Sequence, residues 1–294
     1  MELHLHLGAH KTASTHFQRV MLCNRRLYEH AAHYVPLNEF RANVTRASRF
    51  LDPRCRGAVD DYLVRLGSTQ SRSLIISEEN ILGEANDAYR ARRLYRHLGK
   101  RAGRLKEFVS GFEDTTIWIA VRSMDEFIPA LYCEALLHFR IRRFGRFFSG
   151  RYEQSWVPVI LTLRDIFPQT KIIVIPYETY RETLPHWVAA MTGVDTGWDL
   201  LSGERPRESA NHFAVKIMGV VHPFCSRARA PVVLEALSRH FYRKGIGGKF
   251  SPFGESVRNR LRSRYKSDLQ EIESLGEGIS LFQKSSRSRN NAGF

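Results

Sequence analysis

The chain has 294 residues, with 45 Lys and Arg against 30 Asp and Glu, so its formal net charge is +15 and its isoelectric point is about 10.0. With 43% hydrophobic and 26% charged residues, the composition is that of a packed globular protein, which excludes wholesale disorder. The longest apolar stretches, such as 117–121 and 172–175, are far shorter than the roughly 20 residues that a membrane-spanning helix needs. We therefore expect no such helix.

The N-terminal segment and the cysteines indicate the compartment. Residues 1–7 lack the basic and apolar regions of a signal peptide, and the four cysteines are scattered without a CxxC pair. A reducing cytoplasm is the simplest location. The positive charge attracts anions, so nucleic acid, acidic polysaccharide, anionic lipid and phosphorylated cofactors are all consistent with it.

Two segments concentrate this charge. Residues 89–106 hold eight basic residues and no acidic one, and residues 140–151 hold five arginines interspersed with phenylalanines. A solvated helix face is the ordinary interpretation of such runs, and a site for an anionic partner is the alternative.

Strand and helix patterns alternate along the chain. Alternation of leucine with polar residues predicts a strand over 2–7, followed by a loop and a helix over 15–26. Continuous apolar runs predict buried strands at 73–77, 115–121 and 171–176. Helical periodicity predicts helices at 124–139, 154–167, 180–192, 210–221 and 232–242. This order predicts one three-layer α/β domain over 1–283, with a mostly parallel central sheet flanked by helices and with helical insertions, and a loosely ordered basic tail over 284–294.

The loop after the first predicted strand has the composition of an anion site. It reads Gly8-Ala9-His10-Lys11-Thr12-Ala13-Ser14-Thr15. Free amides, the Lys11 ammonium and three hydroxyls suit a phosphate-like group at the carboxyl edge of a sheet. Lys11 follows Gly8 by three residues, so the loop does not fit the nucleotide triphosphatase pattern G-x-x-x-x-G-K-[ST]. The alternative is a hydroxyl-rich cap on an ordinary helix.

This loop resembles the 5′-phosphosulfate loop of the sulfotransferase family, a relative of the P-loop proteins. In that family a lysine, a hydroxyl residue, usually a glycine, and two hydroxyl residues close on the 5′-phosphate of 3′-phosphoadenosine-5′-phosphosulfate (PAPS). The resemblance implies that the cofactor is bound by Gly8, His10, Lys11, Thr12, Ala13, Ser14 and Thr15. Ala13 stands where the family usually has glycine.

Two further segments extend the resemblance over most of the chain. Arg122 follows the third predicted strand, as the arginine of the family's 3′-phosphate segment does, although Ala130 replaces the serine found eight residues later. Arg243, Lys244 and Gly245 resemble the start of the family's R-K-G-x-x-G loop, which also holds the 3′-phosphate. The alternatives are a salt bridge from Arg122 to a nearby acid on its helix, and a surface glycine turn at 243–248.

The resemblance implies in-line transfer of a sulfuryl group from PAPS to a hydroxyl or amine. Lys11 would stabilise charge on the leaving group, and the general base would be a carboxylate at the end of the second predicted strand, as in carbohydrate sulfotransferases. We choose Glu78 for this role, with Glu79 and His138 as alternatives. We assign Glu178 a structural role. No metal is expected, because the histidines lack a matching set of ligands.

The expected function is therefore that of a PAPS-dependent sulfotransferase. Its acceptor would be a small molecule or a carbohydrate, and the arginine-rich segments would suit an anionic or lipid-linked glycan. No nucleic-acid partner is expected, and the sequence does not specify an oligomeric state. Two alternatives stay open: a P-loop kinase or nucleotidase with a variant loop, and a non-catalytic polyanion-binding module on the same fold.

Overall fold

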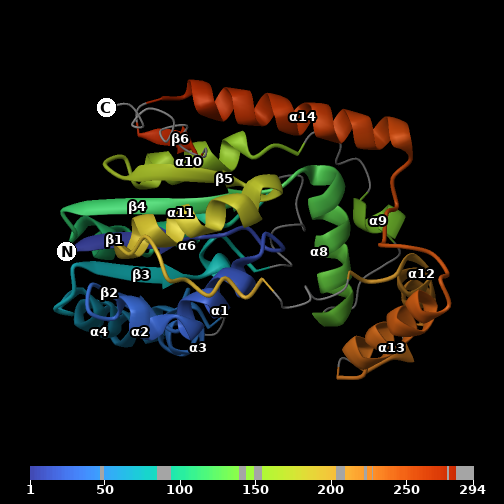
Figure 1. Ribbon diagram of the computed structural model, residues 1–294, viewed down its shortest axis with the longest axis horizontal. Helices are drawn as coiled ribbons and strands as arrows, with labels where there is room; N and C mark the ends of the chain where they lie inside the picture. Colours follow the sequence, from blue (N-terminus) through green and yellow to red (C-terminus); the bar gives the residue numbers. More distant parts are fainter. Residues whose placement is uncertain are drawn as a thin grey trace, which may run out of the picture.

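The computed structural model describes residues 1–46, 50–84, 94–138, 144–148, 154–202, 209–221, 224–226, 228–276 and 278–282, with the backbone alone at 137, 138, 146 and 147. Six parallel strands form one sheet in the order β2-β3-β1-β4-β5-β6, and helices lie on both of its faces (Figure 1). The strands are β1 Glu2–His6, β2 Ala32–Val35, β3 Ser73–Ser77, β4 Asp114–Val121, β5 Lys171–Pro176 and β6 Ile279–Leu281. The three-layer α/β fold predicted from the sequence is confirmed.

The helices occupy the connections between these strands and the region after β5. In chain order they are α1 Ser14–Cys23, α2 Arg25–Tyr28, α3 Leu37–Phe40, α4 Arg56–Gly67, α6 Leu98–Gly103, α7 Lys106–Ser110, α8 Met124–His138, α9 Phe144–Phe148, α10 Val157–Ile166, α11 Tyr180–Thr192, α12 His212–Val221, α13 Ala230–Arg243 and α14 Glu255–Ser274. A π-helical turn, Arg41–Thr45, follows α3. Figure 1 shows α12 and α13 at one end of the molecule, beyond α8.

Strand β1 is the centre of the sheet and is buried on both faces. It pairs with β3 on one side and with β4 on the other. Leu3 and Leu5 pack into the larger hydrophobic core, whereas His4 and His6 point to the opposite face, where the aromatic side chains of α1 and α11 lie. The alternating pattern therefore predicted the strand, and His4 and His6 at its polar positions are buried because helices cover that face of the sheet as well.

The two strands that the sequence did not predict are short, and the first predicted helix is divided in two. β2 and β6 have four and three residues, too few for a pattern to emerge. The helix predicted over 15–26 divides at Asn24, whose side-chain amide bonds the Val20 carbonyl and so ends α1.

In the described part of the chain, no helix is long and apolar enough to cross a membrane. The tail 284–294, most of the arginine-rich segment 140–151 and the His138 side chain lie outside the described residues.

One buried carboxylate joins the last long helix to the rest of the fold. Asp268 on α14 is fully buried and accepts hydrogen bonds from the Trp156 amide and the Ser155 hydroxyl, both at 2.8 Å. Arg264, one turn earlier on α14, pairs with it at 3.0 Å. These contacts place the start of α10 against the middle of α14.

Replacing Asp268 with Ala should lower the free energy of unfolding by about 3 kcal/mol, because the buried amide and hydroxyl lose their acceptor and a charge loses its partner. Urea unfolding followed by circular dichroism measures this change. Glu271→Ala, at an exposed position of the same helix, should change it by less than about 0.5 kcal/mol. Similar losses in the two variants would show that Asp268 does not anchor α14.

Candidate functional site

The carboxyl ends of the three central strands meet at one edge of the sheet. The Leu7 and Ala9 amides donate to the Trp118 and Ala120 carbonyls, at 2.8 and 3.2 Å, and the Glu78 amide donates to the His6 carbonyl at 3.0 Å. The loop between β1 and α1 is therefore fixed between the end of β3 and the end of β4. This is the edge at which open parallel sheets bind ligands.

The backbone of the loop adopts an unusual conformation at the residues of the motif. Lys11 and Ala13 have φ of 64° and 67°, in the left-handed region that L-residues enter at a penalty of about 1–2 kcal/mol. Ala13 thus takes a backbone conformation that favours glycine, the residue that the resembling family usually has there. A Cβ at Gly8 would collide with the Ser14 hydroxyl, so a glycine is required there.

The start of α1 is left without a cap. The N-cap residue is Ala13, which has no oxygen to offer, so the first-turn amides of Ser14 and Thr15 have no side-chain acceptor from it. The Ser14 hydroxyl is buried and finds no hydrogen-bond partner among the described residues. Thr12 bonds the Ala9 carbonyl within the loop. The hydroxyl cap considered from the sequence is not formed, and the helix N-terminus is free to attract an anion.

Lys11 meets a carboxylate that the sequence did not single out. Its ammonium lies 3.1 Å from Glu134 on α8, and both side chains are partly exposed. The Lys11 carbonyl accepts a hydrogen bond from the Arg122 guanidinium at 2.9 Å. Arg122, directly after β4, thus supports the loop from the side opposite to β3.

Arg122 also forms the salt bridge that was the alternative interpretation. Its second terminal nitrogen lies 2.9 Å from Glu126, and its guanidinium stacks over the Tyr177 ring at 4.3 Å. Its Nε is buried and has no hydrogen-bond partner within the described part of the chain. The site therefore contains a largely buried guanidinium with a donor still unused.

Lys249 completes this cationic group, and the sequence motifs did not point to it. Its ammonium forms an ion pair with Glu126, so one carboxylate serves two cations. Partial burial and the nearby charge of Arg122 lower the pKa of Lys249. Two cations at such close range favour an added anion.

The three residues chosen from the R-K-G pattern lie elsewhere on the same segment. Arg243, Lys244 and Gly245 are exposed at the C-terminal end of α13, and Gly245 has φ of 65°. Among the described residues, no hydrogen bond or ion pair joins Arg243 or Lys244 to the loop. The residue of this segment that reaches the strand ends is Lys249, five positions further on.

The two candidate bases differ sharply in their surroundings. The Glu78 side chain is fully buried and accepts hydrogen bonds from Arg41 at 2.8 Å, from the Thr45 hydroxyl at 2.6 Å and from the Asn80 amide at 3.0 Å. The π-helical turn positions Arg41 and Thr45 for this. Glu79 is partly exposed, with Arg41 at 3.1 Å. The geometry favours Glu79 over Glu78 as a base, because the Glu78 oxygens are enclosed and already occupied.

Two histidines at the end of β1 and in the loop are held neutral. His10 bonds the Tyr95 hydroxyl through Nδ1 at 3.1 Å and Asn80 through Nε2 at 3.3 Å, and burial lowers its pKa to about 4. His6 bonds the Ser77 hydroxyl at 2.8 Å, and burial lowers its pKa to about 3.

Glu178 accepts hydrogen bonds from the Ser123 amide and the Tyr265 hydroxyl, which agrees with the structural role predicted for it.

No protein-family model matches the chain, and no curated protein sequence is significantly similar to it. The resemblance to sulfotransferases rests on the loop and the two segments described above. No group of His, Cys, Asp or Glu that could hold a metal ion occurs in the described ranges.

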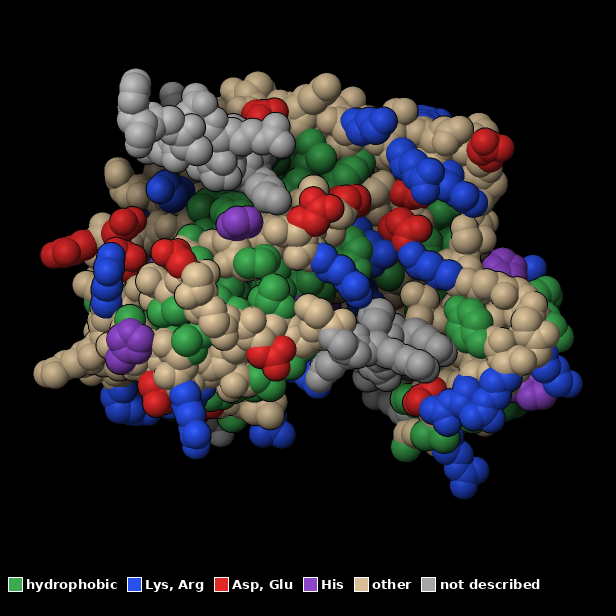
Figure 2. Space-filling view, in the orientation of Figure 1, with side chains coloured by type: hydrophobic (Ala, Val, Ile, Leu, Met, Phe, Trp, Pro, Cys, Tyr) green, Lys and Arg blue, Asp and Glu red, His purple; other side chains and the backbone are tan. Residues whose placement is uncertain are grey.

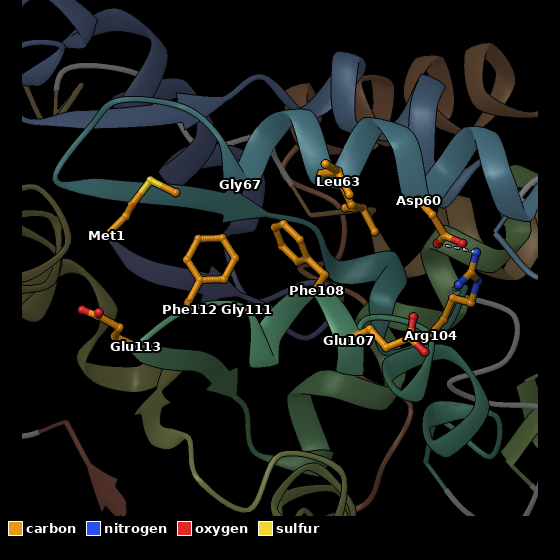
Figure 3. A pocket seen from close by; sticks show the side chains of 11 residues that line it. Met1, Asp60, Leu63, Gly67, Arg104, Glu107, Phe108, Gly111, Phe112 and Glu113 are labelled. Atoms are coloured by element: carbon orange, nitrogen blue, oxygen red, sulfur yellow. Dashed lines mark ion pairs between the residues drawn. The ribbon is translucent and has the colours of Figure 1, made fainter.

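A pocket of about 440 Å³ lies away from this site, at the amino edge of the sheet (Figure 3). It is lined by Met1, by residues of α4 and α7, and by the segment before β4. Phe108 and Phe112 face it in Figure 3, and an ion pair between Asp60 and Arg104 lies at one end. The amino ends of the strands lie at the opposite edge of the sheet from the β1–α1 loop, so we assign the pocket no part in the chemistry.

The different burial of the two glutamates predicts different effects on stability. Glu78→Gln should lower the free energy of unfolding by about 2–3 kcal/mol, because the buried carboxylate that accepts from Arg41, the Thr45 hydroxyl and the Asn80 amide loses its charge. Glu79→Gln should lower it by less than about 1 kcal/mol, since its pair is partly solvated. Chemical denaturation of both variants measures this. The reverse order would overturn the structural role of Glu78.

The neutral histidines predict a dependence of stability on pH. Both have a pKa of about 6.5 when unfolded, so below that pH the unfolded chain binds protons that the native protein excludes. The free energy of unfolding should be unaffected by them above pH 6.5 and fall by about 1.4 kcal/mol per pH unit for each histidine as the pH is lowered. His6→Phe should remove one of these contributions.

Urea titrations between pH 6 and 4.5 measure that slope. His186→Gln, at an exposed position of α11, is the control and should keep the slope of the unmodified protein. An unchanged slope in His6→Phe would show that His6 is protonated in the native state.

Proposed function

We propose that this protein is a PAPS-dependent sulfotransferase that acts on a hydroxyl or amine of a glycan-containing acceptor. The observation that carries the proposal is the loop at the end of β1. Its left-handed turn at Ala13, the uncapped start of α1 and the Lys11 ammonium lie together beside the buried Arg122. Such a loop suits the 5′-phosphosulfate, and PAPS when bound supplies the sulfuryl group and a phosphate leaving group.

The binding roles follow from position. The amides of Ser14 and Thr15 and the unused Ser14 hydroxyl would hold the 5′-phosphate, and Lys11 would neutralise charge on the bridging oxygen. To reach that oxygen the Lys11 ammonium must first leave the Glu134 carboxylate, with which it pairs in the absence of an anion. Arg122 and Lys249 would hold the 3′-phosphate. Arg243, Lys244 and Gly245 remain predicted contacts of the same phosphate.

The acceptor would approach from the β3 side of the loop. In-line attack places the acceptor opposite the bridging oxygen of the 5′-phosphate, which would leave as its bond to sulfur breaks, and a base at the end of β3 would stand beside that path. Glu79 stands at the end of β3 and is partly exposed, with its orientation held by Arg41. We therefore assign it, in place of Glu78, the removal of the acceptor proton.

The direct test is thermal stabilisation of the protein by 3′,5′-adenosine bisphosphate, measured by scanning fluorimetry at physiological salt. At about 100 times its dissociation constant the bisphosphate should stabilise the native state by about 2.7 kcal/mol. ADP, 5′-AMP and ATP with magnesium should produce little or no shift, because they lack a 3′-phosphate for Arg122 and Lys249.

Two variants connect this result to the site. Lys11→Ala and Lys249→Ala should each reduce the shift, whereas Lys100→Ala, at an exposed lysine of α6, should not. A shift with ATP and magnesium alone would favour the kinase or nucleotidase. No shift with any nucleotide would favour a polyanion-binding module.

A further inference from the structure

The helical hairpin formed by α12, α13 and their flanking residues presents an unusual surface. Nine large hydrophobic side chains are exposed in the described part of the chain, and six of them lie between residues 213 and 246. They are Phe213, Ile217, Val220, Phe224, Val232 and Ile246. Single exposed apolar residues are ordinary, but such a concentration on one element marks an interaction surface.

The exposed residues of α12 form a stripe. Phe213, Ile217 and Val220 follow helical spacing and are 42%, 38% and 56% exposed, whereas Ala214 and Met218 are fully buried. One face of α12 therefore packs against the protein and the other presents apolar side chains to solvent. Val232, on the first turn of α13, is 67% exposed, and α13 packs against α12.

The same segment is basic. Residues 209–242, which leave out the cations assigned to the 3′-phosphate, contain four Lys and Arg and one acidic residue, Glu235. Glu235 already pairs with Arg239 at 2.8 Å. Figure 2 shows green and blue side chains together over this end of the molecule. An apolar stripe with basic residues around it is the pattern of helices that lie in the interface of a membrane, where apolar side chains enter the acyl boundary and Lys and Arg meet anionic headgroups.

The hairpin is held firmly to the body of the protein. Phe250 packs against Tyr132 of α8 with ring centroids 5.7 Å apart, and Lys249 pairs with Glu126 of the same helix. The surface therefore does not have to fold on contact with a partner, because its helices are already formed and oriented.

We propose that the α12–α13 hairpin docks this protein onto a membrane surface that carries anionic phospholipids. The charge of the hairpin favours a membrane over a second copy of the chain, and its aliphatic side chains favour a membrane over nucleic acid. Two copies of the hairpin would bring like charges together, which opposes a symmetric dimer through this face. Nucleic acid would meet the basic residues, but it would leave the aliphatic Ile217, Val220 and Val232 exposed, because bases stack on aromatic side chains.

Sedimentation with vesicles tests the proposal on the full chain, without any nucleotide. Vesicles of phosphatidylcholine with about 30% phosphatidylglycerol should bind the protein at least about tenfold more strongly than vesicles of phosphatidylcholine alone, since each basic residue near the surface adds to the attraction. Raised salt should weaken the binding. Because the measurement does not involve the loop at β1, its outcome is independent of the proposed sulfotransferase activity.

Matched variants distinguish the hairpin from the overall positive charge. The triple variant Phe213→Ser, Ile217→Ser, Val220→Ser should lower binding at least about tenfold, whereas Leu22→Ser, Val64→Ser, Leu161→Ser, at exposed sites outside the hairpin, should not. Lys216→Glu with Arg229→Glu should lower it more than Arg65→Glu with Arg72→Glu, which changes the net charge equally. Circular dichroism confirms that each variant is folded.

Three results would overturn the proposal. One is equal binding to the two kinds of vesicle, and another is an equal loss of binding in the hairpin variants and their controls. The third is an absence of vesicle binding together with a dimer, seen by analytical ultracentrifugation, that the Phe213 triple variant dissociates. That result would assign the surface to a second copy of the chain.

Discussion

The pairing of β1 between β3 and β4 is the constraint on which the candidate site depends. Because the three strands are parallel and in register, their carboxyl ends meet, and main-chain hydrogen bonds from Leu7, Ala9 and Glu78 hold the loop between them. This support lets Lys11 and Ala13 remain in left-handed conformations that an isolated loop would leave. The loop, Arg122 and Glu79 are then brought together from three separate parts of the sequence.

The cations of the candidate site pair with carboxylates of the chain itself. Lys11 pairs with Glu134, Arg122 and Lys249 share Glu126, and Arg41 holds Glu78 and Glu79. Glu134 and Glu126 are partly exposed, so an incoming phosphate could replace these carboxylates at a modest loss of interaction energy. In the pair between Arg41 and Glu78 the carboxylate is fully buried, so this pair stabilises the fold.

The fold was predictable wherever a segment was long and its pattern clear. The strands at 73–77 and 171–176 and the helix at 180–192 occur where the apolar runs and the helical period placed them. β2 and β6 were not predicted, since three or four residues carry no period and such strands form only because a neighbouring strand supplies the hydrogen bonds. The π-helical turn at Arg41 was not predicted either, because it depends on contacts of Arg41 and Thr45 with the buried Glu78, which is distant in the sequence.

The sequence by itself determined the fold class, the positions of the central strands and the chemical character of the first loop. These are local properties of hydrophobic period and residue type. Only the tertiary structure decided that Glu78 is enclosed while Glu79 is accessible, that Lys249 rather than Arg243 reaches Glu126, and that Glu134 meets Lys11. These contacts join residues 37 to 123 positions apart. Sequence periodicity carries no information about such distances, because burial and pairing depend on how the helices pack on the sheet.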